Sequence, residues 1–394
     1  MNLKGKTIVL GITGGIAAYK MPNVAHALVK LGADVHVLMT QNATEFITPL
    51  VFETLTNRRC IVDTFDRNFQ YDVAHVSLAN AADLMLIAPA TANVIAKMAH
   101  GQADDMLTTV TLAAHCPKLV APAMNTHMLE NPITQDNIRT LEHYGFTVIP
   151  SGSGLLACGD VGSGRLPEES VLVDYVLREL ACEKDLTGKK VVVSAGATQE
   201  PMDPVRYLTN HSTGKMGYAV ARACMLRGAE VVLLSSTSCT QPDVPFVKKV
   251  PFTTAKDLFE AVKANAMDAD ALVMAAAVAD YRPAEVAADK VKKHDGEMNI
   301  ALERTDDILA WVGAHKPETL FVCGFSMETR DLVENSTAKL NKKMDMIVAN
   351  NLKVPGAGFG VDTNVVTIIT REGAEQLPLQ SKDDVAMAIV DHFA

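Results

Sequence analysis

LKGKTIVLGITGG, at Leu3–Gly15, and LTGKKVVVSAGAT, at Leu186–Thr198, are two stretches of this sequence that begin alike. Each has Leu, one variable residue, Gly and Lys before a run of β-branched apolar residues that ends in small residues. Each leads into a helical pattern and then a second apolar strand, which is how a doubly wound α/β unit begins. The sequence therefore predicts two such units, joined by a charged, turn-prone linker near residues 181–189.

The remainder of each half alternates apolar strands with helical segments, which favours a mostly parallel sheet in each half. In the first half a helix is expected over Ile16–Leu31, and the expected strands are Thr7–Ile12, Val35–Met39, Leu84–Ala88, Leu119–Ala121 and Thr147–Ile149. In the second half the expected strands are Val191–Ala195, Val231–Ser235, Ala271–Ala277, Phe321–Phe325 and Met346–Ala349, with a late hairpin of Val365–Ile369 and Glu375–Leu377. We therefore predict an α/β fold of two doubly wound Rossmann-like domains, residues 1–185 and residues 186–394.

Composition excludes several classes of function. The 394 residues carry a net charge of −10 with no basic block, which argues against non-specific binding of nucleic acid. No uncharged apolar stretch reaches the roughly 18 residues that a membrane span needs. The 7 cysteines are odd in number and lack a CxxC pair, so we expect a reducing compartment, the cytoplasm, rather than a disulfide framework or zinc ribbon.

Four features of the first half are candidate sites. GITGGIAAYK (Gly11–Lys20) and APATANVIAKMAHG (Ala88–Gly101) are strand-to-helix junctions of the kind that bind phosphate, although a plain turn or helix cap would have the same pattern. His75 and Asn125, the latter in APAMNTHM, are either site residues or ordinary structural ones. GLLACGDVGSGR (154–165) indicates a flexible glycine-rich loop in which Cys158 is accessible enough to react.

Together, GITGGIAAYK, the His75 segment, APATANVIAK, PAMNTHM and ACGDVGSGR resemble, in family order, the flavin-dependent phosphopantothenoylcysteine decarboxylases. The resemblance implies a flavodoxin-like flavoprotein domain that binds FMN. It also implies that His75 is the active-site histidine, that Asn125 holds the substrate carboxylate and that Cys158 protonates the product. The FMN ligands that it implies are Thr13, Gly14, Gly15, Ile16, Thr40, Ala90, Thr91 and Asn93.

The richest part of the second half is the polar loop SAGATQEPMDPVRYLTNHSTGKMG (Ser194–Gly217), which follows a core strand. With AAAVADYRP, KVKK, TDDIL, GFSMET and KLNKKMD it resembles phosphopantothenate–cysteine ligase, a nucleotide-binding domain, and covers the rest of the chain. In bacteria the two enzymes are fused with the decarboxylase first, which is the order found here.

The ligase resemblance implies that CTP activates the phosphopantothenate carboxylate and that the amine of cysteine then attacks the acyl-cytidylate. Lys290 would serve the first step, and Asn210 would position the acyl-cytidylate with Arg206 nearby. Mg²⁺, with Asp280 as its protein ligand, would reduce the repulsion between the phosphopantothenate carboxylate and the phosphates of CTP. The implied nucleotide-binding residues are Met274, Ala275, Ala276, Asp280, Lys290, Thr305, Asp306, Asp307, Ile308, Phe325, Lys339 and Lys343.

Two positions depart from the ligase pattern. Gln199 stands where arginine is common, and KLNKKMD is one residue short, which leaves Lys342 and Lys343 as alternatives for one nucleotide contact. The alternatives to a bifunctional enzyme are a degenerate ligase half, a non-enzymatic flavoprotein and a nicotinamide oxidoreductase, the last disfavoured by the missing GxGxxG. The partners expected from the resemblance are phosphopantothenate, cysteine and CTP, together with further copies of the chain in a homo-oligomer. The resemblance implies a trimer or dodecamer through the first domain, in which His75 acts in a neighbour's site, and a dimer through the second domain.

Overall fold

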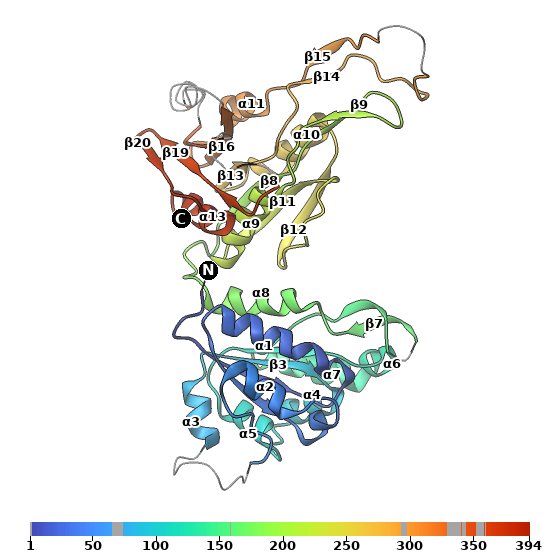
Figure 1. The fold of residues 1–394 in the computed structure, drawn as a ribbon, viewed down its shortest axis with the longest axis vertical. Coiled ribbons are helices and arrows are strands. Elements are labelled where there is room, and N and C mark those ends of the chain that lie inside the picture. The colour runs from blue at the N-terminus through green and yellow to red at the C-terminus, as the bar shows by residue number, and fades with distance from the viewer. Residues whose placement is uncertain are drawn as a thin grey trace. The chain divides into compact units, whose positions relative to one another are not determined.

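The structure is a computed structural model that describes residues 2–64, 74–157, 159–292, 298–328, 340, 344–351, 358 and 360–394. The chain divides into two compact units, Met1–Glu183 and Lys184–Ala394, and each has its own sheet and its own core (Figure 1). The α/β fold with a doubly wound sheet in each half is confirmed. Among the described residues, no helix combines the length and the apolar character needed to cross a bilayer.

The first unit is built on a five-stranded parallel sheet in the order β2-β1-β3-β4-β5. This order is that of the flavodoxin-like fold, whose switch point lies between the first and third strands. Every residue of β3 is buried, because helices cover both faces of the sheet. The strands are β1 (Thr7–Ile12), β2 (Asp34–Met39), β3 (Leu84–Ala90), β4 (Lys118–Pro122) and β5 (Thr147–Val148).

The helix expected over Ile16–Leu31 is divided in the structure. A short 3-10 helix, η1 (Ile16–Lys20), precedes α1 (Met21–Lys30). Pro22 accounts for the division, because a proline ring is compatible with the first turn of an α-helix but not with its interior. The other helices of the unit are η2 (Gln41–Glu45), α2 (Pro49–Thr56), α3 (Ala74–Ala81), α4 (Ala92–Ala99), α5 (Met106–Ala113), α6 (Thr126–Glu130), α7 (Pro132–His143) and α8 (Glu169–Leu180).

The glycine-rich stretch 154–165 is not the irregular loop that its composition predicts. Most of it belongs to an antiparallel hairpin of β6 (Gly152–Leu155) and β7 (Val161–Arg165). Its tip is held by the Leu156 amide, which donates to the Asp160 carbonyl oxygen over 2.8 Å. Cys158 lies outside the described residues.

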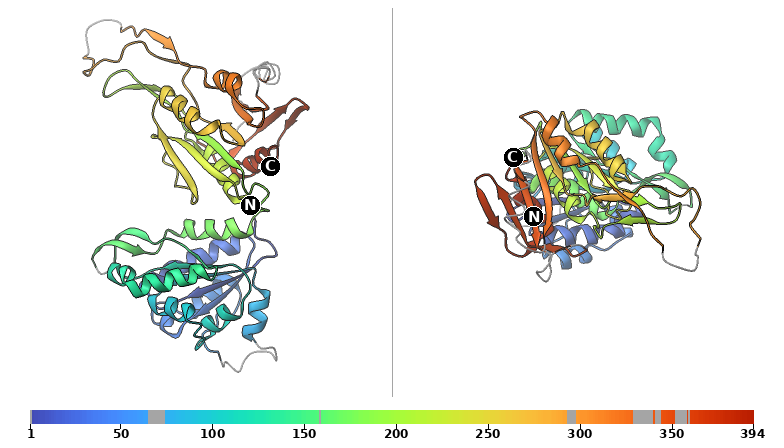
Figure 2. Two further views of the ribbon diagram at one scale, coloured as in Figure 1. Left: turned by 180° about the vertical axis from the view of Figure 1, so that it is seen from behind. Right: turned by 90° about the horizontal axis from the view of Figure 1, so that it is seen from above.

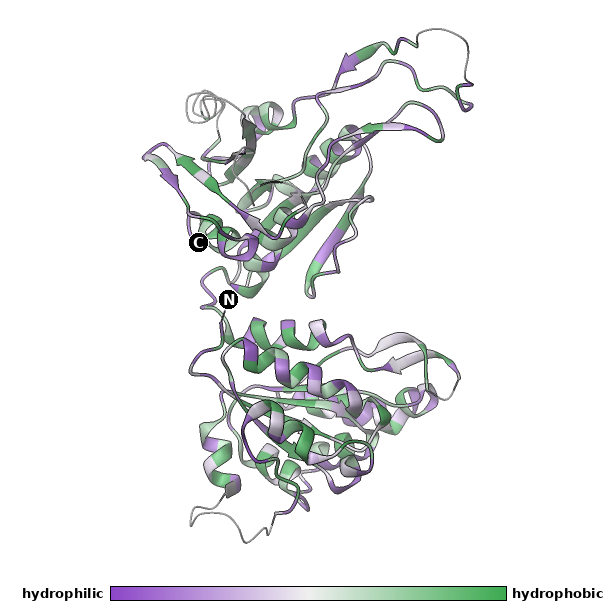
Figure 3. Ribbon diagram, in the orientation of Figure 1, coloured by the Kyte–Doolittle hydropathy of each residue, from purple (hydrophilic) through white to green (hydrophobic). Residues whose placement is uncertain are grey.

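The second unit has an eight-stranded sheet in the order β12-β11-β8-β13-β16-β17-β19-β20. When the strands of this sheet alone are numbered in chain order, the first six follow the dinucleotide-fold order 3-2-1-4-5-6 and are parallel. Strands β19 and β20 form an antiparallel hairpin at one edge. The strands are β8 (Lys190–Ala195), β11 (Glu230–Ser236), β12 (Val247–Phe252), β13 (Ala271–Met274), β16 (Phe321–Glu328), β17 (Met346–Asn351), β19 (Val366–Thr370) and β20 (Gly373–Gln376). Figure 3 shows hydrophobic residues along the central strands of both units, and most of these residues are buried.

The strand expected over Ala271–Ala277 ends at Met274, because the chain then leaves the sheet. Ala277 instead bonds to the segment after β8: its amide donates to Gly196 O over 2.8 Å and its carbonyl accepts from Thr198 N over 3.2 Å. Short antiparallel pairs of β9 (Gln199–Pro201) with β10 (Tyr207–Thr209) and of β14 (Tyr281–Pro283) with β15 (Leu302–Arg304) project from the sheet (Figure 1). The remaining elements are α9 (Lys215–Leu226), α10 (Ala255–Ala266), α11 (Ile308–His315), β18 (Thr363–Asn364), β21 (Gln380–Ser381) and α13 (Lys382–Val390).

Candidate functional site

In the first unit, the predicted FMN segments all follow the carboxyl ends of parallel strands. Residues 13–16 follow β1, Thr40 follows β2, and residues 90–93 overlap the end of β3 and the start of α4. Strands β1 and β3 are neighbours at the switch point, where ligands of open α/β sheets bind. The strand order thus brings the predicted segments to one edge of the sheet.

The Thr13 hydroxyl joins two of these segments. It donates to Pro89 O over 2.6 Å and accepts from Thr91 N over 3.0 Å, and the residue is fully buried. Both hydrogen-bonding functions of the hydroxyl are therefore used within the protein, so Thr13 holds the two turns together. The Thr91 hydroxyl in turn caps α4 by accepting from Val94 N.

Thr40 and Gly14 fit a ligand at this edge. The Thr40 hydroxyl is buried and has no hydrogen-bond partner among the described residues, which is a position that a ligand polar atom would satisfy. A Cβ on Gly14 would lie 2.5 Å from Asn42 Cβ, so only glycine lets this turn approach the segment after β2. The residues present are compatible with a flavin phosphate and ribityl chain.

Asn125 follows β4 and caps α6 with a defined amide orientation. Its Oδ1 accepts from His127 N over 2.9 Å, and its Nδ2 donates to the Asp160 carboxylate over 3.2 Å. Because the His127 backbone N–H fixes the position of Asn125 Oδ1, Asn125 Nδ2 faces the tip of the β6–β7 hairpin.

The β6–β7 hairpin docks on the segment that carries Asn125. Met124 N donates to Gly164 O over 3.0 Å, and Thr126 Oγ1 donates to Ser163 O over 2.8 Å. A Cβ on Gly162 would lie 2.5 Å from Thr126 Oγ1, and one on Gly164 would lie 2.2 Å from Met124 O. Gly162 therefore leaves space for the Thr126 side chain, and Gly164 allows close approach of two backbones.

His75 is not brought to Asn125 within one chain. It lies in the first turn of α3, and α3 is on the opposite side of the unit from α6 and β7 in both side views (Figures 1 and 2). A site that uses both side chains would need α3 from a second copy.

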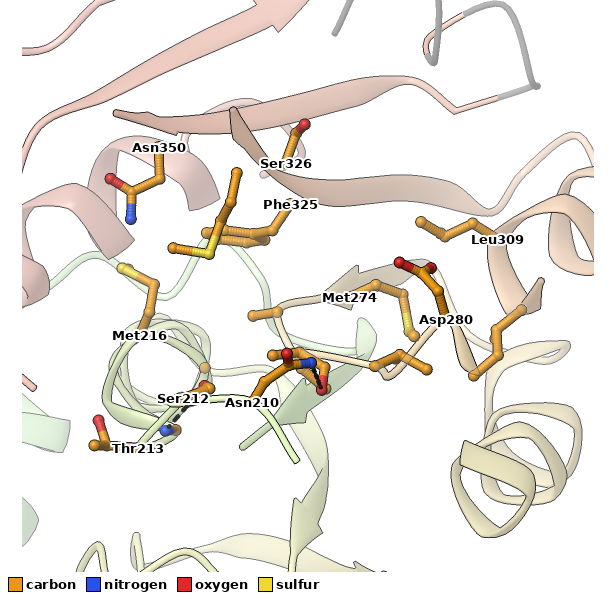
Figure 4. Close-up of a pocket in the computed structure, with 18 of the residues that line it drawn as sticks. Asn210, Ser212, Thr213, Met216, Met274, Asp280, Leu309, Phe325, Ser326 and Asn350 are labelled. Atoms are coloured by element: carbon orange, nitrogen blue, oxygen red, sulfur yellow. Dashed lines mark hydrogen bonds between the residues drawn. The ribbon is translucent and has the colours of Figure 1, made fainter. Parts of the chain in front are cut away.

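The second unit contains a cavity of about 580 Å³ at the switch point between β8 and β13. Its walls come from the segment between β10 and α9, from the segment that follows β13, from residues within β16 and β17, and from the start of α11 (Figure 4). The predicted ligase residues that line it are Asn210, Met274, Ala275, Ala276, Asp280, Thr305, Asp306, Asp307, Ile308 and Phe325.

Hydrogen bonds between these segments fix the cavity wall. Asn210 Nδ2 donates to Ala277 O over 3.3 Å, and Thr305 Oγ1 donates to Ala279 O over 2.6 Å. Asp307 caps α11 by accepting from Ala310 N over 2.9 Å. Each bond joins a predicted residue to the backbone, so these residues shape the wall as well as line it.

Arg206 and Lys290 lie outside the residues that line the cavity. Arg206 pairs with Asp203, whose side chain is 1% exposed, and it also donates to Val291 O over 2.8 Å. The hydrogen bond from Arg206 and those from three backbone amides hold the pKa of Asp203 well below its usual range. Lys290 is exposed next to this cluster. Lys339, Lys342 and Lys343 lie outside the described residues.

Sequence reasoning did not identify Asn350 and Lys382, which also line the cavity. Asn350 is 8% exposed, and its Oδ1 has no partner among the described residues; Figure 4 shows its amide directed to the side where Met216 lies. In the sequence, the position of Asn350 near the end of an apolar strand is the feature that could have indicated a site residue. Lys382 donates to Val361 O over 2.6 Å, and burial lowers its pKa. Nothing in the sequence around Lys382 marks it.

In the described part of the chain, no group of three or more His, Cys, Asp or Glu side chains is placed to hold a metal ion. Asp280 is an exposed carboxylate at the cavity. Mg²⁺ at nucleotide sites commonly uses one or two carboxylates together with phosphate oxygens, so Asp280 fits such a site.

Comparisons with known proteins cover both units. Residues 1–181 match the family model described as "Flavoprotein", and residues 186–394 match "DNA/pantothenate metabolism flavoprotein C-terminal domain". The coenzyme A biosynthesis bifunctional protein CoaBC of Bacillus subtilis (strain 168) is 44% identical over 396 residues, which is 100% of this chain and 97% of that protein.

Two solved structures are similar to parts of the chain. The C-terminal domain of a coenzyme A biosynthesis bifunctional protein CoaBC is 38% identical, with a TM-score of 0.45, over 52% of this chain and 94% of that chain. A mutant PPC decarboxylase complexed with pantothenoylaminoethenethiol is 32% identical, with a TM-score of 0.40, over 43% of this chain and 96% of that chain. The full-length identity and the two family matches show that the chain belongs to the family of bifunctional coenzyme A biosynthesis proteins.

Proposed function

We propose that residues 186–394 join cysteine to 4′-phosphopantothenate with CTP, and that residues 1–185 decarboxylate the resulting 4′-phosphopantothenoylcysteine to 4′-phosphopantetheine with FMN. One observation carries the proposal. In the first unit, motifs that are far apart in the sequence follow the parallel strands β1, β2 and β3 beside the switch point of the sheet. In the second unit, residues of distant motifs line one cavity at the switch point. Full-length similarity to a bifunctional relative supports the assignment of one activity to each unit.

For the ligase step, the cavity of the second unit would hold CTP and the phosphopantothenate carboxylate. Two anions must approach one another, so positive groups are needed to offset their repulsion. Asp280 would hold Mg²⁺, which supplies Lewis-acid stabilisation of the phosphate charge. Lys290, Lys339 and Lys343 would contribute positive charge, and Asn210 would position the acyl-cytidylate for attack by the amine of cysteine.

For the decarboxylase step, FMN supplies reversible two-electron oxidation of the substrate thiol when bound. A thioaldehyde formed from the thiol would let the electrons left by CO₂ loss delocalise onto sulfur. Asn125 Nδ2 would bind the carboxylate that is lost. The enethiol left by CO₂ loss would still lack the two electrons removed in the oxidation. Cys158 would donate the proton, and reversal of the two-electron oxidation would return a hydride equivalent to complete the product.

We further propose that the site of the first unit is completed by a second copy of the chain. The separation of α3, which carries His75, from α6 within one unit supports this, because a site that uses both His75 and Asn125 would need α3 from another copy. Exposed apolar side chains, among them Ile16 at 58% and Tyr19 at 61%, would be covered in such a homo-oligomer. The cysteine pattern of the sequence supports the proposal of a cytoplasmic location.

The test is the product mass after full-length protein receives phosphopantothenate, cysteine, CTP and Mg²⁺. We expect release of pyrophosphate followed by loss of CO₂, and a yellow protein. A colourless protein that releases no CO₂ would contradict the decarboxylase assignment. The Cys158→Ser variant should bind flavin and release CO₂ but accumulate an oxidised product, and normal turnover would show that Cys158 is not the acid.

A further inference from the structure

The amide of Asn125 already contacts a carboxylate in this structure. Asn125 Nδ2 donates to Asp160 Oδ2 over 3.2 Å, while its Oδ1 is held by His127 N. In the proposed decarboxylase, the same amide nitrogen binds the carboxylate of the substrate. A side chain of this protein therefore presents the functional group that Asn125 would recognise.

The backbone sets Asp160 in this place. Leu156 N donates to Asp160 O, which closes the tip of the hairpin, and Asp160 directly precedes β7. Strand β7 is in turn bonded to Met124 and Thr126, on either side of Asn125, through the carbonyls of Gly164 and Ser163. The position of Asp160 relative to Asn125 thus follows from the backbone hydrogen bonds of the hairpin and from the bonds between β7 and residues 124–126.

Two carboxylates are poorly accommodated on one asparagine amide. The amide is neutral, so it offers no charge to offset the repulsion between two anions a few ångströms apart. Nδ2 has two N–H donors, but two carboxylates that accept from them would lie a few ångströms apart without a compensating charge. This repulsion makes a ligand carboxylate compete with Asp160 at Nδ2. A ligand without a carboxylate would leave the contact between Asn125 and Asp160 undisturbed.

We propose that Asp160 is an internal competitor for the carboxylate site of the decarboxylase, a specificity-determining residue that the substrate must displace from Asn125 Nδ2. The inference rests on the proposed role of Asn125. It implies that Asp160 lowers the affinity for carboxylate-bearing ligands only, and that Asp160 can return to the amide once CO₂ has left.

The test uses full-length, FMN-loaded protein without CTP and two ligands that differ by one carboxylate. These are 4′-phosphopantothenoylserine and 4′-phosphopantothenoylethanolamine, in which a hydroxyl replaces the thiol so that neither is oxidised. Dissociation constants are measured by flavin absorbance or calorimetry. We expect Asp160→Ala to bind the serine ligand roughly three- to tenfold more tightly than the wild type. The ethanolamine ligand should change by less than about twofold.

Asp160→Asn provides a second variant, because it keeps the size of the side chain and removes its charge. It should also tighten binding of the serine ligand selectively. Asp136→Asn on α7 removes the same charge away from the hairpin and should alter neither ligand selectively. Equal changes for both ligands, or weaker binding of the serine ligand, would overturn the inference and show that Asp160 only orients the amide or supports the hairpin.

The outcome also separates this inference from the proposed function. Asn125→Ala should abolish the contribution of the ligand carboxylate to binding. If the wild type binds neither ligand, or if Asn125→Ala keeps the full preference for the serine ligand, the proposed site is wrong. If Asn125→Ala loses that preference and both Asp160 variants leave it unchanged, the site stands and the inference fails.

Discussion

The Met124 amide donates to the Gly164 carbonyl over 3.0 Å, and a Cβ on Gly164 would lie 2.2 Å from the Met124 carbonyl oxygen. This contact joins β7 to the turn that carries Asn125. Gly164 also has φ +115°, a conformation that residues with a Cβ rarely adopt. The glycine is thus required twice, once for its backbone angle and once for the space beside Met124.

The first prediction follows from this contact. Gly164→Ala forces β7 away from residues 124–126, so decarboxylation should fall by roughly 10²-fold, the effect of a displacement of about 1 Å in a site. Flavin content and ligase activity should remain. Gly145→Ala is the control, because Gly145 lies outside the proposed site and also has a positive φ of +84°, but no described atom lies within 4 Å of its Cβ position. A similar loss in both variants would assign the effect to backbone strain alone.

The second prediction concerns the hydroxyl of Thr13. Thr13→Val leaves Pro89 O and Thr91 N without their buried partner, which should destabilise the first unit by roughly 2 kcal/mol. It should also reduce the flavin content of the purified protein, because the two turns lose their connection. Thr13→Ser retains the hydroxyl and should keep both properties. Thermal unfolding of the flavin-free protein measures the first effect, and visible absorbance measures the second. Unchanged flavin content in Thr13→Val would show that flavin binding does not need the connection between the two turns.

The third prediction concerns Asn350, whose buried Oδ1 has no partner among the described residues. Asn350→Leu removes an unsatisfied polar atom, so the thermal stability of the free protein should not fall. CTP-dependent release of pyrophosphate below saturation should decrease by roughly tenfold, the value of one good hydrogen bond.

Asn364 offers the matched control for Asn350, since it also lines the cavity and is 2% exposed. Its Oδ1 accepts from Val365 N over 3.0 Å, so Asn364→Leu should lower the stability of the free protein. Equal loss of stability in the two variants would show that Asn350 Oδ1 has a structural partner.

Sequence predicts most of the sheets because their strands are continuous apolar runs. Thr7–Ile12 is a strand with the predicted bounds. Five of its six residues are buried, as expected for a continuous apolar strand in a sheet that is covered on both faces. Strand order then brings Asn210, Asp280 and Thr305 to one cavity, although they are far apart in the sequence. Their convergence follows from the rule that sites of open sheets lie at the switch point.

The hairpin of residues 152–165 could not be predicted in the same way. Its glycines carry no alternating apolar pattern, and β7 forms because Gly162 and Gly164 let it bond to residues 124–126. That requirement is tertiary and is invisible in the local sequence. Lys382 was missed for a related reason: its buried ammonium is recognisable only from the carbonyls of Gly358 and Val361, which the fold brings to it.

The last prediction concerns the pH dependence of the second unit. The hydrogen bond from Arg206 is the main cause that lowers the pKa of Asp203, so this carboxylate binds a proton less readily in the folded than in the unfolded state. Its contribution to stability is therefore fully present above the unfolded pKa of about 3.9 and is lost as the pH falls through the lower folded value. Asp203→Asn should unfold at lower urea concentration than the wild type at pH 6, and the difference should shrink below pH of about 4.

The control for this pH effect is Asp268→Asn, which removes an exposed carboxylate paired with Lys190. Solvent screens such a pair, so its effect on the urea midpoint at pH 6 should be much smaller than that of Asp203→Asn. Arg206→Met should reproduce the loss seen in Asp203→Asn, because it leaves Asp203 without the group that stabilises its charge. If the difference between Asp203→Asn and the wild type stays constant from pH 6 to pH 3, the bond between Asp203 and Arg206 does not stabilise the ionised carboxylate in the folded protein.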